Sequence, residues 1–444
     1  MAPVLRIVPK DENTLVTNLI TQKENIAVVG LGYVGLPLAL EFASILKVKG
    51  FDISESKVKA MKEKNDPSNE LSEAHFNEKK IEFSSDERIL EQARFYVVAV
   101  PTPVTSDNVP NLKPLISATE TVARHLKRDD YVVFESTVYP GCTEEVCVPI
   151  LENISGLKLN QDFKVGYSPE RINPGDTQNT VTTITKVVSG SDEEAAEQIA
   201  NVYDLIIEAG VHVAPNIKTA EACKVVENTQ RDVNIALMNE LSMLFEKMGI
   251  NTNDVLRATK TKWNALPFFP GLVGGHCIGV DPYYLAYKAN ELGVESDIIL
   301  TSRKVNEELP KRIADNVKQA LLKNNKNIAK SKVLVRGITF KENVSDIRNS
   351  KVANMIHNLK AMGAQVNIED PFASSEEVEK EYGLSLYQGS SSEKYDAIII
   401  AVAHNQYRFH NADYYKKMSN DKAIVFDLRN IVTEVDTEMD YYTL

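Results

Sequence analysis

Two short segments of the chain carry residue types whose spacing is suited to chemistry. The first runs from Gly274 to Asp281 and places Cys277 after two glycines and a histidine, with a carboxylate four residues further on. The second, Gly30 to Gly35, reads Gly-Leu-Gly-Tyr-Val-Gly and matches the dinucleotide-binding pattern GxGxxG. A nicotinamide enzyme that also has a nucleophilic cysteine can oxidise an alcohol past the aldehyde to the acid.

The glycine segment has the flanks that a dinucleotide-binding loop needs. A strand-like run, Asn25 to Val29, precedes it, and a helical run, Leu36 to Ala43, follows. The glycines permit a tight turn, close approach of a diphosphate, and close packing of the helix on the strand. Asp52 ends the next strand-like run and is suited to bind the adenosine ribose, so we expect NAD and not NADP. Lys57 lies nearby as a further cofactor-binding candidate, and its positive charge weakens this discrimination against NADP. The cofactor-binding candidates in the loop are Gly30, Gly32, Tyr33, Val34 and Gly35.

The composition is typical of a large enzyme. The 444 residues are 43% hydrophobic and carry a net charge of −12, which argues against nucleic-acid binding and a basic membrane surface. No apolar run is long enough to span a membrane, and residues 1–22 are unlike a signal peptide, so a cytoplasmic location is expected. The four cysteines are too scattered for a disulfide framework, and their spacing predicts no metal site.

Strand-like and helical segments alternate after the glycine loop, as in a parallel sheet wound with helices. The expected strands are Arg94 to Val100, Tyr131 to Val138, Lys164 to Ser168 and Thr185 to Gly190. Ligands of such sheets lie beyond the carboxyl ends of the strands. The loops after the first two of these strands therefore supply four more cofactor-binding candidates, Pro101, Thr102, Ser136 and Thr137.

A helix of about 50 Å is predicted from Asn216 to Gly249, which contains no proline or interior glycine. Glu221, Lys224 and Asn228 recur at three and four residues and so share one face. Their apolar neighbours favour a polar stripe that points into a cleft, and a solvated stripe is the alternative. A helix of this length also suggests a dimer interface.

A second wound sheet is predicted after a basic, asparagine-rich stretch, beginning with the strand Lys332 to Gly337. A helix from Ser350 to Met362 and further strands follow, at Ala364 to Ile368, Tyr395 to Val402 and Ala423 to Asp427. No second GxGxxG accompanies them. Lys341 and Arg348 follow the first strand and can meet a diphosphate, unless they are ordinary solvated charges.

The expected fold class is therefore α/β, with two Rossmann-like doubly wound parallel-sheet domains joined by a long central helix. The expected divisions are an N-terminal extension (1–22), an NAD-binding domain (23–212), a central helical and dimerisation domain (213–325) and a C-terminal domain (326–444). The role of residues 1–22 is open.

Taken together, the motifs closely resemble the UDP-glucose/GDP-mannose dehydrogenase family over residues 24–435. The glycine loop, Val-Pro-Thr-Pro from Val100, Glu135-Ser136-Thr137, Ser168-Pro169-Glu170, the Lys224 to Asn228 helix, Gly274 to Cys277, Asp281 and Phe340-Lys341 occur in the family order. The segments Lys262 to Asn264 and Pro270 to Tyr284 look like the UDP-N-acetylhexosamine 6-dehydrogenase branch. His276 stands where UDP-glucose enzymes tend to have serine. UDP-glucose enzymes also carry an arginine near the position that Asn264 occupies in this chain, so the contact made by that arginine cannot be transferred.

The resemblance implies a four-electron oxidation of a sugar C6 alcohol to a carboxylate with two NAD in turn. Asp281, through water, or Lys224 would take the hydroxyl proton, while Lys224 and Asn228 would stabilise the oxyanion. Cys277 would attack the aldehyde, and His276 or Lys224 would lower its pKa. Glu170 would be the general base for thioester hydrolysis, and Thr137 would position the water.

The resemblance also implies that the C-terminal domain, residues 326–444, binds the UDP-sugar. The substrate would then lie between two domains, with the long helix as the floor of the site. Arg348 would reach the cofactor, either within its own subunit or across a subunit boundary in a homodimer or higher oligomer. The substrate-binding residues would be Glu170, Arg171, Lys224, Asn228, Phe269, Gly271, Gly274, Gly275, Phe340 and Lys341.

The substrate expected from the resemblance is UDP-N-acetylglucosamine, in the synthesis of a surface polysaccharide precursor. UDP-N-acetylgalactosamine, UDP-N-acetylmannosamine and UDP-glucose stay open, as do oligomer size, feedback regulation and the pathway served. Two other classes also stay open: a two-electron hydroxy-acid dehydrogenase, which would not need Cys277, and an NAD-responsive regulatory protein. The joint presence of Lys224, Asn228, Cys277 and Asp281 favours the four-electron enzyme.

Overall fold

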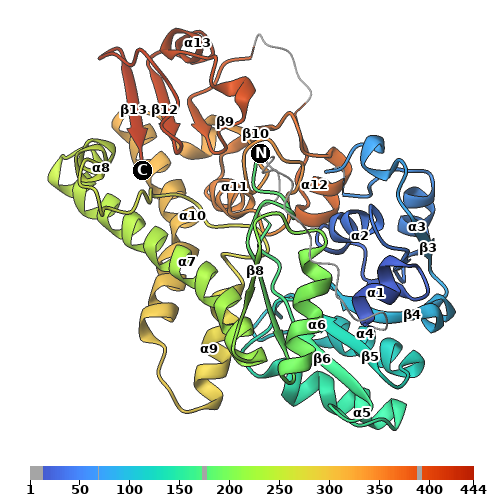
Figure 1. Ribbon diagram of the computed structural model, residues 1–444. Coiled ribbons are helices and arrows are strands. Elements are labelled where there is room, and N and C mark those ends of the chain that lie inside the picture. Colours follow the sequence, from blue (N-terminus) through green and yellow to red (C-terminus); the bar gives the residue numbers. More distant parts are fainter. Residues whose placement is uncertain (1–13, 69, 173–177, 388–392) are drawn as a thin grey trace. The chain divides into compact units, whose positions relative to one another are not determined.

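The structure, a computed structural model, describes residues 14–68, 70–172, 178–387 and 393–444 (Figure 1). The chain divides into two compact units. The first unit contains the described residues up to Glu227 and the segment Tyr283–Val294. The second unit contains Asn228–Pro282 and the described part of Glu295–Leu444.

The first unit is built on a sheet whose strand order, among the described residues, is β3-β2-β1-β4-β5-β6-β7-β8. The chain moves outward from β1 through β2 to β3, and then crosses back to β4 on the other side of β1. This reversal between β1 and β4 is the position at which wound sheets bind nucleotides. The strands are β1 Asn25–Val29, β2 Val48–Phe51, β3 Ile81–Ser84, β4 Ala93–Val98, β5 Asp130–Phe134, β6 Phe163–Tyr167, β7 Lys186–Gly190 and β8 Val211–Val213.

Both faces of this sheet are buried, as an apolar parallel strand requires. Ile26 and Val28 lie in one core with residues of α1, α2 and α6, and the alternate residues Ala27 and Val29 are buried as well. The helices that the first unit contains in full are α1 Leu15–Ile20, α2 Gly35–Ala43, α3 Glu55–Lys62, α4 Lys113–His125, α5 Val148–Ser155 and α6 Glu193–Asp204.

One strand departs from the expected parallel arrangement. β7 runs antiparallel to β6, with Gly166 opposite Gly190 and Tyr167 opposite Ser189. A parallel return needs a crossover segment, usually a helix. The described part of this connection, 168–172 and 178–185, contains no helix, so the chain turns back directly. As a result, the first residue of β7 lies at the edge where β5 and β6 end.

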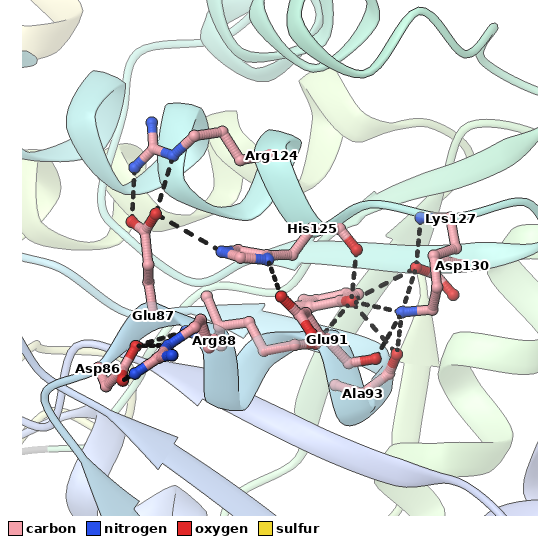
Figure 2. Close-up of polar contacts among 11 residues, drawn as sticks. Asp86, Glu87, Arg88, Glu91, Ala93, Arg124, His125, Lys127 and Asp130 are labelled. Carbon is pink, nitrogen blue, oxygen red and sulfur yellow. Dashed lines mark hydrogen bonds and ion pairs between the residues drawn. The ribbon is translucent and has the colours of Figure 1, made fainter.

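A charged cluster lies at the opposite end of the strands of the first sheet, where β4 and β5 begin (Figure 2). The Asp130 carboxylate accepts a hydrogen bond from the Lys127 amide at 2.8 Å, and the Lys127 ammonium donates to the Tyr96 hydroxyl at 3.2 Å. Arg124 makes a paired contact with Glu87, at 3.1 and 2.7 Å. The cluster therefore joins α4 to the sheet at the end away from the glycine loop.

The second unit contains a smaller, wholly parallel sheet, with the order β10-β9-β11-β12-β13 among the described residues. α10 and α11 cover one face through a core with Val333 and Val335, and α13 covers the other through a core with Leu334. The strands are β9 Lys332–Arg336, β10 Gln365–Glu369, β11 Ala397–Ile400, β12 Ala423–Asp427 and β13 Met439–Thr443.

The long helix is confirmed as α7, Ile217–Met248, which ends at Gly249 in a left-handed conformation with a φ of 70°. Residues up to Glu227 belong to the first unit and the rest to the second. The other helices are α8 Thr252–Lys260, α9 Asp281–Glu291, α10 Asp297–Lys323, α11 Lys351–Ala361, α12 Ser375–Tyr382 and α13 Ala412–Lys417.

The predicted α/β class, with two wound sheets and a long central helix, is thus confirmed, except for the direction of β7. The predicted divisions near residues 22, 212 and 325 stay predictions. Residues 1–13 of the expected N-terminal extension lie outside the described residues, whereas α1 buries Leu15, Val16 and Leu19 in the first core. Within the part of the chain that the structure describes, no helix has the length and apolarity needed to cross a membrane.

Candidate functional site

The glycine loop has the geometry of a dinucleotide cradle. Gly30 has a φ of 89°, and a Cβ atom there would lie 2.8 Å from the Val100 side chain. A Cβ atom on Gly35 would lie 1.9 Å from the Gly30 carbonyl oxygen, so α2 can approach the strand only because that atom is absent. A Cβ atom on Gly32 would meet nothing within 4 Å, which leaves the loop open on the side where a diphosphate would approach.

The start of α2 is also free of side-chain capping. Val34 stands at the N-cap position and makes no side-chain cap hydrogen bond. Helix N-termini present amide groups that bind phosphate well. The residues of this loop therefore fit an NAD diphosphate; Tyr33 and Val34 are half-buried in it.

Asp52 lies where the sequence predicts a ribose-binding carboxylate, just after β2 and beside the glycine loop. It is 8% exposed, and its two oxygens accept the amides of Leu31 and Ser54, each at 2.9 Å. These bonds hold the carboxylate against the loop and leave further lone pairs for a ribose hydroxyl. Lys57 is exposed on α3.

The loops after β4 and β5 are tied together. The Ser136 hydroxyl donates to the Val100 carbonyl at 2.7 Å. The Tyr284 hydroxyl, from α9, donates to the carbonyls of Thr102 at 3.0 Å and Pro103 at 3.2 Å. The structure thus brings Ser136 and the loop of Pro101 and Thr102 to one edge of the first sheet, with Thr137 half-buried next in the chain.

A buried ion pair joins the loops after β5 and β6. The Lys186 ammonium donates to the Glu135 carboxylate at 2.6 Å and to the Pro169 carbonyl at 3.2 Å. Burial raises the pKa of Glu135, as does the nearby charge of Glu170, whereas Lys186 opposes the rise. Glu170 is 7% exposed, and its carboxylate accepts the Ile172 amide. Sequence reasoning did not assign Lys186 a role, because its position depends on the unexpected direction of β7.

The expected polar stripe on α7 is only partly as predicted. Glu221 is fully buried and accepts the amides of Gly141 and Thr143, at 2.5 and 2.8 Å, so it caps the turn before α5 and does not line a cleft. Burial raises the pKa of Glu221 to about 7. Lys224, one turn further along, is 6% exposed and therefore not solvated.

In the second unit, Asn228 and Asp281 lie together. The Asn228 amide donates to the Asp281 carboxylate at 2.6 Å, and Asp281 is 2% exposed at the first position of α9. The Cys277 carbonyl accepts the Asp281 amide at 2.9 Å, so the cysteine occupies the turn that leads into the same helix. Three of the predicted catalytic residues are thus brought to one place in this unit.

His276 does not supply a positive charge beside Cys277. Burial lowers the pKa of His276 to about 4, and the positive charge of Arg348 contributes. The imidazole is therefore neutral at pH 7 and cannot stabilise a thiolate by its charge.

The glycine pair before Cys277 packs on the loop after β9. A Cβ atom on Gly275, whose φ is 81°, would lie 2.9 Å from the Phe340 ring. A Cβ atom on Gly274 would lie 2.7 Å from the Asn349 carbonyl oxygen, and the Asn349 amide donates to the Gly275 carbonyl at 3.0 Å. Only glycines fit between these two neighbours.

This contact forms one wall of a small, solvent-open pocket in the second unit. Gly274, Phe340 and Lys341, which are three of the predicted substrate-binding residues, line it. Lys351 and Arg429 also line it. These two residues were not predicted from the sequence, because neither belongs to a recognisable motif. The three cations outnumber the one acidic lining residue, Glu342, so the pocket suits a negatively charged ligand.

Two other buried polar groups that shape this region were missed. Asn239 on α7 holds Gly271 by both backbone groups, at 2.8 and 3.1 Å. Asp370, after β10, accepts the amides of Ile338 and Thr339 at 2.7 and 3.1 Å. The position of Asp370 repeats that of Asp52 beside the first glycine loop, and that repeat is the signal that could have identified it.

The remaining predicted residues are Arg171, Phe269 and Arg348. Arg171 pairs with Glu227 at 2.7 Å, and Phe269 is 49% exposed. The Arg348 guanidinium makes two hydrogen bonds to Asp346, at 2.9 and 2.7 Å, which hold it in the loop after β9.

Three family models match the chain, and together they cover most of it. They describe the NAD binding domain, the central domain and the UDP binding domain of the UDP-glucose/GDP-mannose dehydrogenase family, and match residues 24–207, 218–308 and 334–434. Protein CapL of Staphylococcus aureus is 51% identical over 92% of this chain and 96% of its own length. The UDP-N-acetyl-D-glucosamine 6-dehydrogenase of Salmonella typhi is 47% identical over the same shares.

Solved structures agree with the relatives. The UDP-D-ManNAc dehydrogenase of Pyrococcus horikoshii superimposes with a TM-score of 0.87 at 30% identity, over 94% of this chain and 98% of that one. The resemblance read from the motifs is confirmed, and NAD is the cofactor that the matched N-terminal domain binds. The chain belongs to the UDP-glucose/GDP-mannose dehydrogenase family and is an NAD-dependent nucleotide-sugar dehydrogenase.

Proposed function

We propose that the protein oxidises the C6 alcohol of UDP-N-acetylglucosamine to the carboxylate, in the supply of a surface polysaccharide precursor. The observation that carries this proposal is the packing of the Gly274–Gly275 pair on Phe340, two residues before Cys277 and at a pocket lined by three cations and one acid. Relatives from Salmonella typhi and Pseudomonas aeruginosa, 47% and 45% identical, are named UDP-N-acetyl-D-glucosamine 6-dehydrogenase. Both the substrate and the residue roles below are proposals.

NAD would be held by the glycine loop, with Asp52 and Lys57 toward the ribose and Pro101, Thr102, Ser136 and Thr137 along the strand ends. Arg348 is the further cofactor contact. When bound, NAD accepts the hydride that C6 gives up in each of two successive oxidations, so two NAD are used per sugar.

In the first oxidation the C6 hydroxyl must lose a proton. Asp281, through water, or Lys224 takes it, and Lys224 and Asn228 stabilise the negative oxygen by charge and by hydrogen bonding. The 2.6 Å bond from Asn228 to Asp281 supports this assignment, because it fixes the orientation of the amide.

Cys277 then bonds to the aldehyde carbon and retains the intermediate covalently as a thiohemiacetal. A thiolate is required, and a positive charge lowers a thiol pKa. Since His276 is neutral at pH 7, Lys224 is the candidate for that charge. After the second oxidation the cysteine carries a thioester, which water hydrolyses with Glu170 as base and Thr137 as the positioning hydroxyl.

The substrate would be bound by Phe269, Gly271, Gly274, Gly275, Phe340 and Lys341, with Glu170, Arg171, Lys224 and Asn228. Lys341 would meet the diphosphate. The matched UDP binding domain over 334–434 supports this placement of the nucleotide.

We also propose a homodimer or higher homo-oligomer that works in the cytoplasm. The predicted divisions into residues 1–22, 23–212, 213–325 and 326–444 belong to the same proposal, with residues 213–325 as the dimerisation domain. UDP-N-acetylgalactosamine, UDP-N-acetylmannosamine and UDP-glucose remain the alternative substrates.

The decisive experiment counts the NADH formed per sugar consumed by the purified protein with excess NAD. UDP-N-acetylglucosamine is run beside the three alternative nucleotide sugars. We expect two NADH and one uronic acid per UDP-N-acetylglucosamine, with the highest kcat/KM for that sugar. One NADH per sugar would indicate a two-electron dehydrogenase in which Cys277 is structural. No NADH from any sugar would favour a regulatory protein.

A further inference from the structure

Lys186 occupies an unusual position for a lysine in a sheet. It is the first residue of β7, and only the antiparallel direction of that strand brings it to the edge where β5 and β6 end. Lys186 is only 5% exposed, so its charge is not solvated as that of a surface lysine would be. A buried ammonium of this kind is costly unless it is fully paired.

The pairing of Lys186 connects two loops. The ammonium donates to Glu135 at 2.6 Å, at the end of β5, and to the Pro169 carbonyl at 3.2 Å, after β6. The Tyr203 hydroxyl, from α6, donates to the other oxygen of Glu135 at 2.5 Å. All three side chains are buried.

These contacts lie next to the two residues that the proposed hydrolysis requires. Glu135 stands two residues before Thr137. The Pro169 carbonyl belongs to the peptide group whose nitrogen is that of Glu170, so the Lys186 bond fixes the peptide plane from which Glu170 begins. The Glu170 carboxylate is fixed in turn by the Ile172 amide.

We propose that Lys186, with Glu135 and Tyr203, is a positioning group that holds Thr137 and Glu170 at the separation needed to place the hydrolytic water. The inference rests on the proposed function, since it deepens the last step. In that step Glu170 takes a proton from water as the water oxygen bonds to the thioester carbon. The C–S bond then breaks, and its electron pair returns to the Cys277 sulfur.

This role differs from that of an ordinary structural ion pair in what its loss would change. If the pair only stabilised the sheet, its removal would lower the folded fraction and leave each folded molecule normal. If it positions Glu170, folded molecules would complete both oxidations and then stall as the thioester. The readouts are therefore the occupancy of Cys277 by thioester in acid-quenched intact-protein mass spectra, and the first-turnover burst of NADH.

Two variants test the group. Glu135→Gln/Lys186→Met removes both charges together, so that neither is left buried and unpaired. Tyr203→Phe removes one hydroxyl and keeps the ring that packs on Phe42, and it serves if the double variant fails to fold. Lys164→Met is the control. Lys164 lies on β6, near the end of the same sheet opposite to Lys186, and its ammonium forms a 2.5 Å ion pair with Asp192, the N-cap residue of α6.

With UDP-N-acetylglucosamine and NAD, we expect the double variant to give a burst of two NADH per site, and then a kcat lowered about tenfold or more. Its thioester occupancy should rise at least severalfold toward that of Glu170→Gln, with a smaller rise for Tyr203→Phe and none for Lys164→Met. Wild-type occupancy in both test variants would overturn the inference, as would a loss of activity that only follows the folded fraction. Failure of Glu170→Gln itself to accumulate thioester would instead overturn the proposed role of Glu170.

Discussion

Cys277 lies in a turn whose shape is set by its neighbours in the chain rather than by its own side chain. The glycines before it are fixed by Phe340 and Asn349, and the Asp281 amide bonds to its carbonyl. Cys277 is partly buried and not sealed in a core, as is common for reactive cysteines. With His276 neutral at pH 7, the activity of this thiol should not follow the titration of a neighbouring imidazole between pH 6 and 7.

Replacing the sulfur tests the covalent step. We expect Cys277→Ser to slow formation of the acid by at least about two orders of magnitude, because a serine hydroxyl is a much weaker nucleophile than a thiolate at neutral pH. Binding of NAD should be unchanged, since the cofactor loop belongs to the first unit. The measurements are kcat for uronic acid formation and the NAD dissociation constant.

Cys223 provides the control for this variant. It is a half-buried cysteine on α7 whose pKa is raised by burial and by Glu227, and no catalytic role is proposed for it. Cys223→Ser should therefore keep wild-type kcat. Full activity of Cys277→Ser would exclude the covalent mechanism.

At the residue scale, the sequence predicts those functional groups that are recognisable from their neighbours in the chain. The glycines of both loops, Cys277 and Asp281 could be found because each has its chemical context within a few residues. Lys186 and Asn239 could not, because their partners lie 51 and 32 residues away. Glu221 was misplaced for the same reason: helical spacing gives its face but not the two distant amides that it caps.

At the scale of elements, the glycine loop separates cofactor binding from folding. A methyl group on Gly32 would meet no protein atom within 4 Å, so Gly32→Ala should fold normally. It should nevertheless bind NAD at least about tenfold more weakly, because the methyl would occupy space that the diphosphate needs. Calorimetric titration with NAD and thermal unfolding of the apoprotein measure the two effects.

Gly35→Ala is the matched comparison, and the opposite result is expected. Its methyl would lie 1.9 Å from the Gly30 carbonyl oxygen, inside the protein, so the free energy of unfolding should fall by about 1–3 kcal/mol or more. Equal loss of stability in both variants would contradict the conclusion that the loop is open beside Gly32.

The buried carboxyl of Asp130, at the start of β5, should make the stability of the protein depend on pH. Asp130 is fully buried, and burial raises its pKa from 3.8 to about 6, although Lys127 and Arg94 oppose the rise. The folded state therefore holds this proton more tightly than the unfolded chain. Its contribution to stability is complete below about pH 4 and is lost as the pH rises through 6.

We expect Asp130→Asn to remove this loss, because the amide mimics the protonated acid and can still accept the Lys127 amide bond. Relative to wild type, the variant should gain up to about 3 kcal/mol between pH 4 and 7. Urea unfolding at both pH values measures the difference, and a difference that does not change with pH would contradict the shifted pKa.

The elements themselves were largely predictable, and the reasons for the exceptions are physical. β1 and β12 have the expected bounds, because apolar runs between polar turns mark buried strands. β3, β8 and β13 were missed, since each is a short or polar edge strand. The direction of β7 was wrong because residue patterns show that a strand exists but not which way it runs.

At the scale of the whole molecule, the second unit leaves apolar side chains in solvent on one face of α7. Leu237, Leu244 and Met248 are 50%, 52% and 58% exposed and are spaced by seven and four residues. Trp263, after α8, is 92% exposed. Exposed apolar side chains that share one helix face, as the three on α7 do, usually mark an interface, which supports the proposed dimer.

Leu244→Glu should therefore weaken the homodimer by about tenfold or more, since it would bury an unpaired charge. Sedimentation over a range of concentrations measures the effect. Ile154→Glu, on α5 and 43% exposed, is the control and should leave the assembly unchanged. An assembly unaffected by Leu244→Glu would place the interface elsewhere.

The return of Tyr283–Val294 to the first unit has a consequence for biosynthesis. The hydroxyl that supports the loop after β4 comes from Tyr284, 182 residues later in the chain. A ribosome that has completed the sheet of this unit must continue from Glu227 to Val294 before the loop has all its contacts, a delay on the order of 3 to 13 seconds. The nascent NAD-binding unit thus emerges with an unfinished loop after β4 and is open to chaperones and proteases during that interval.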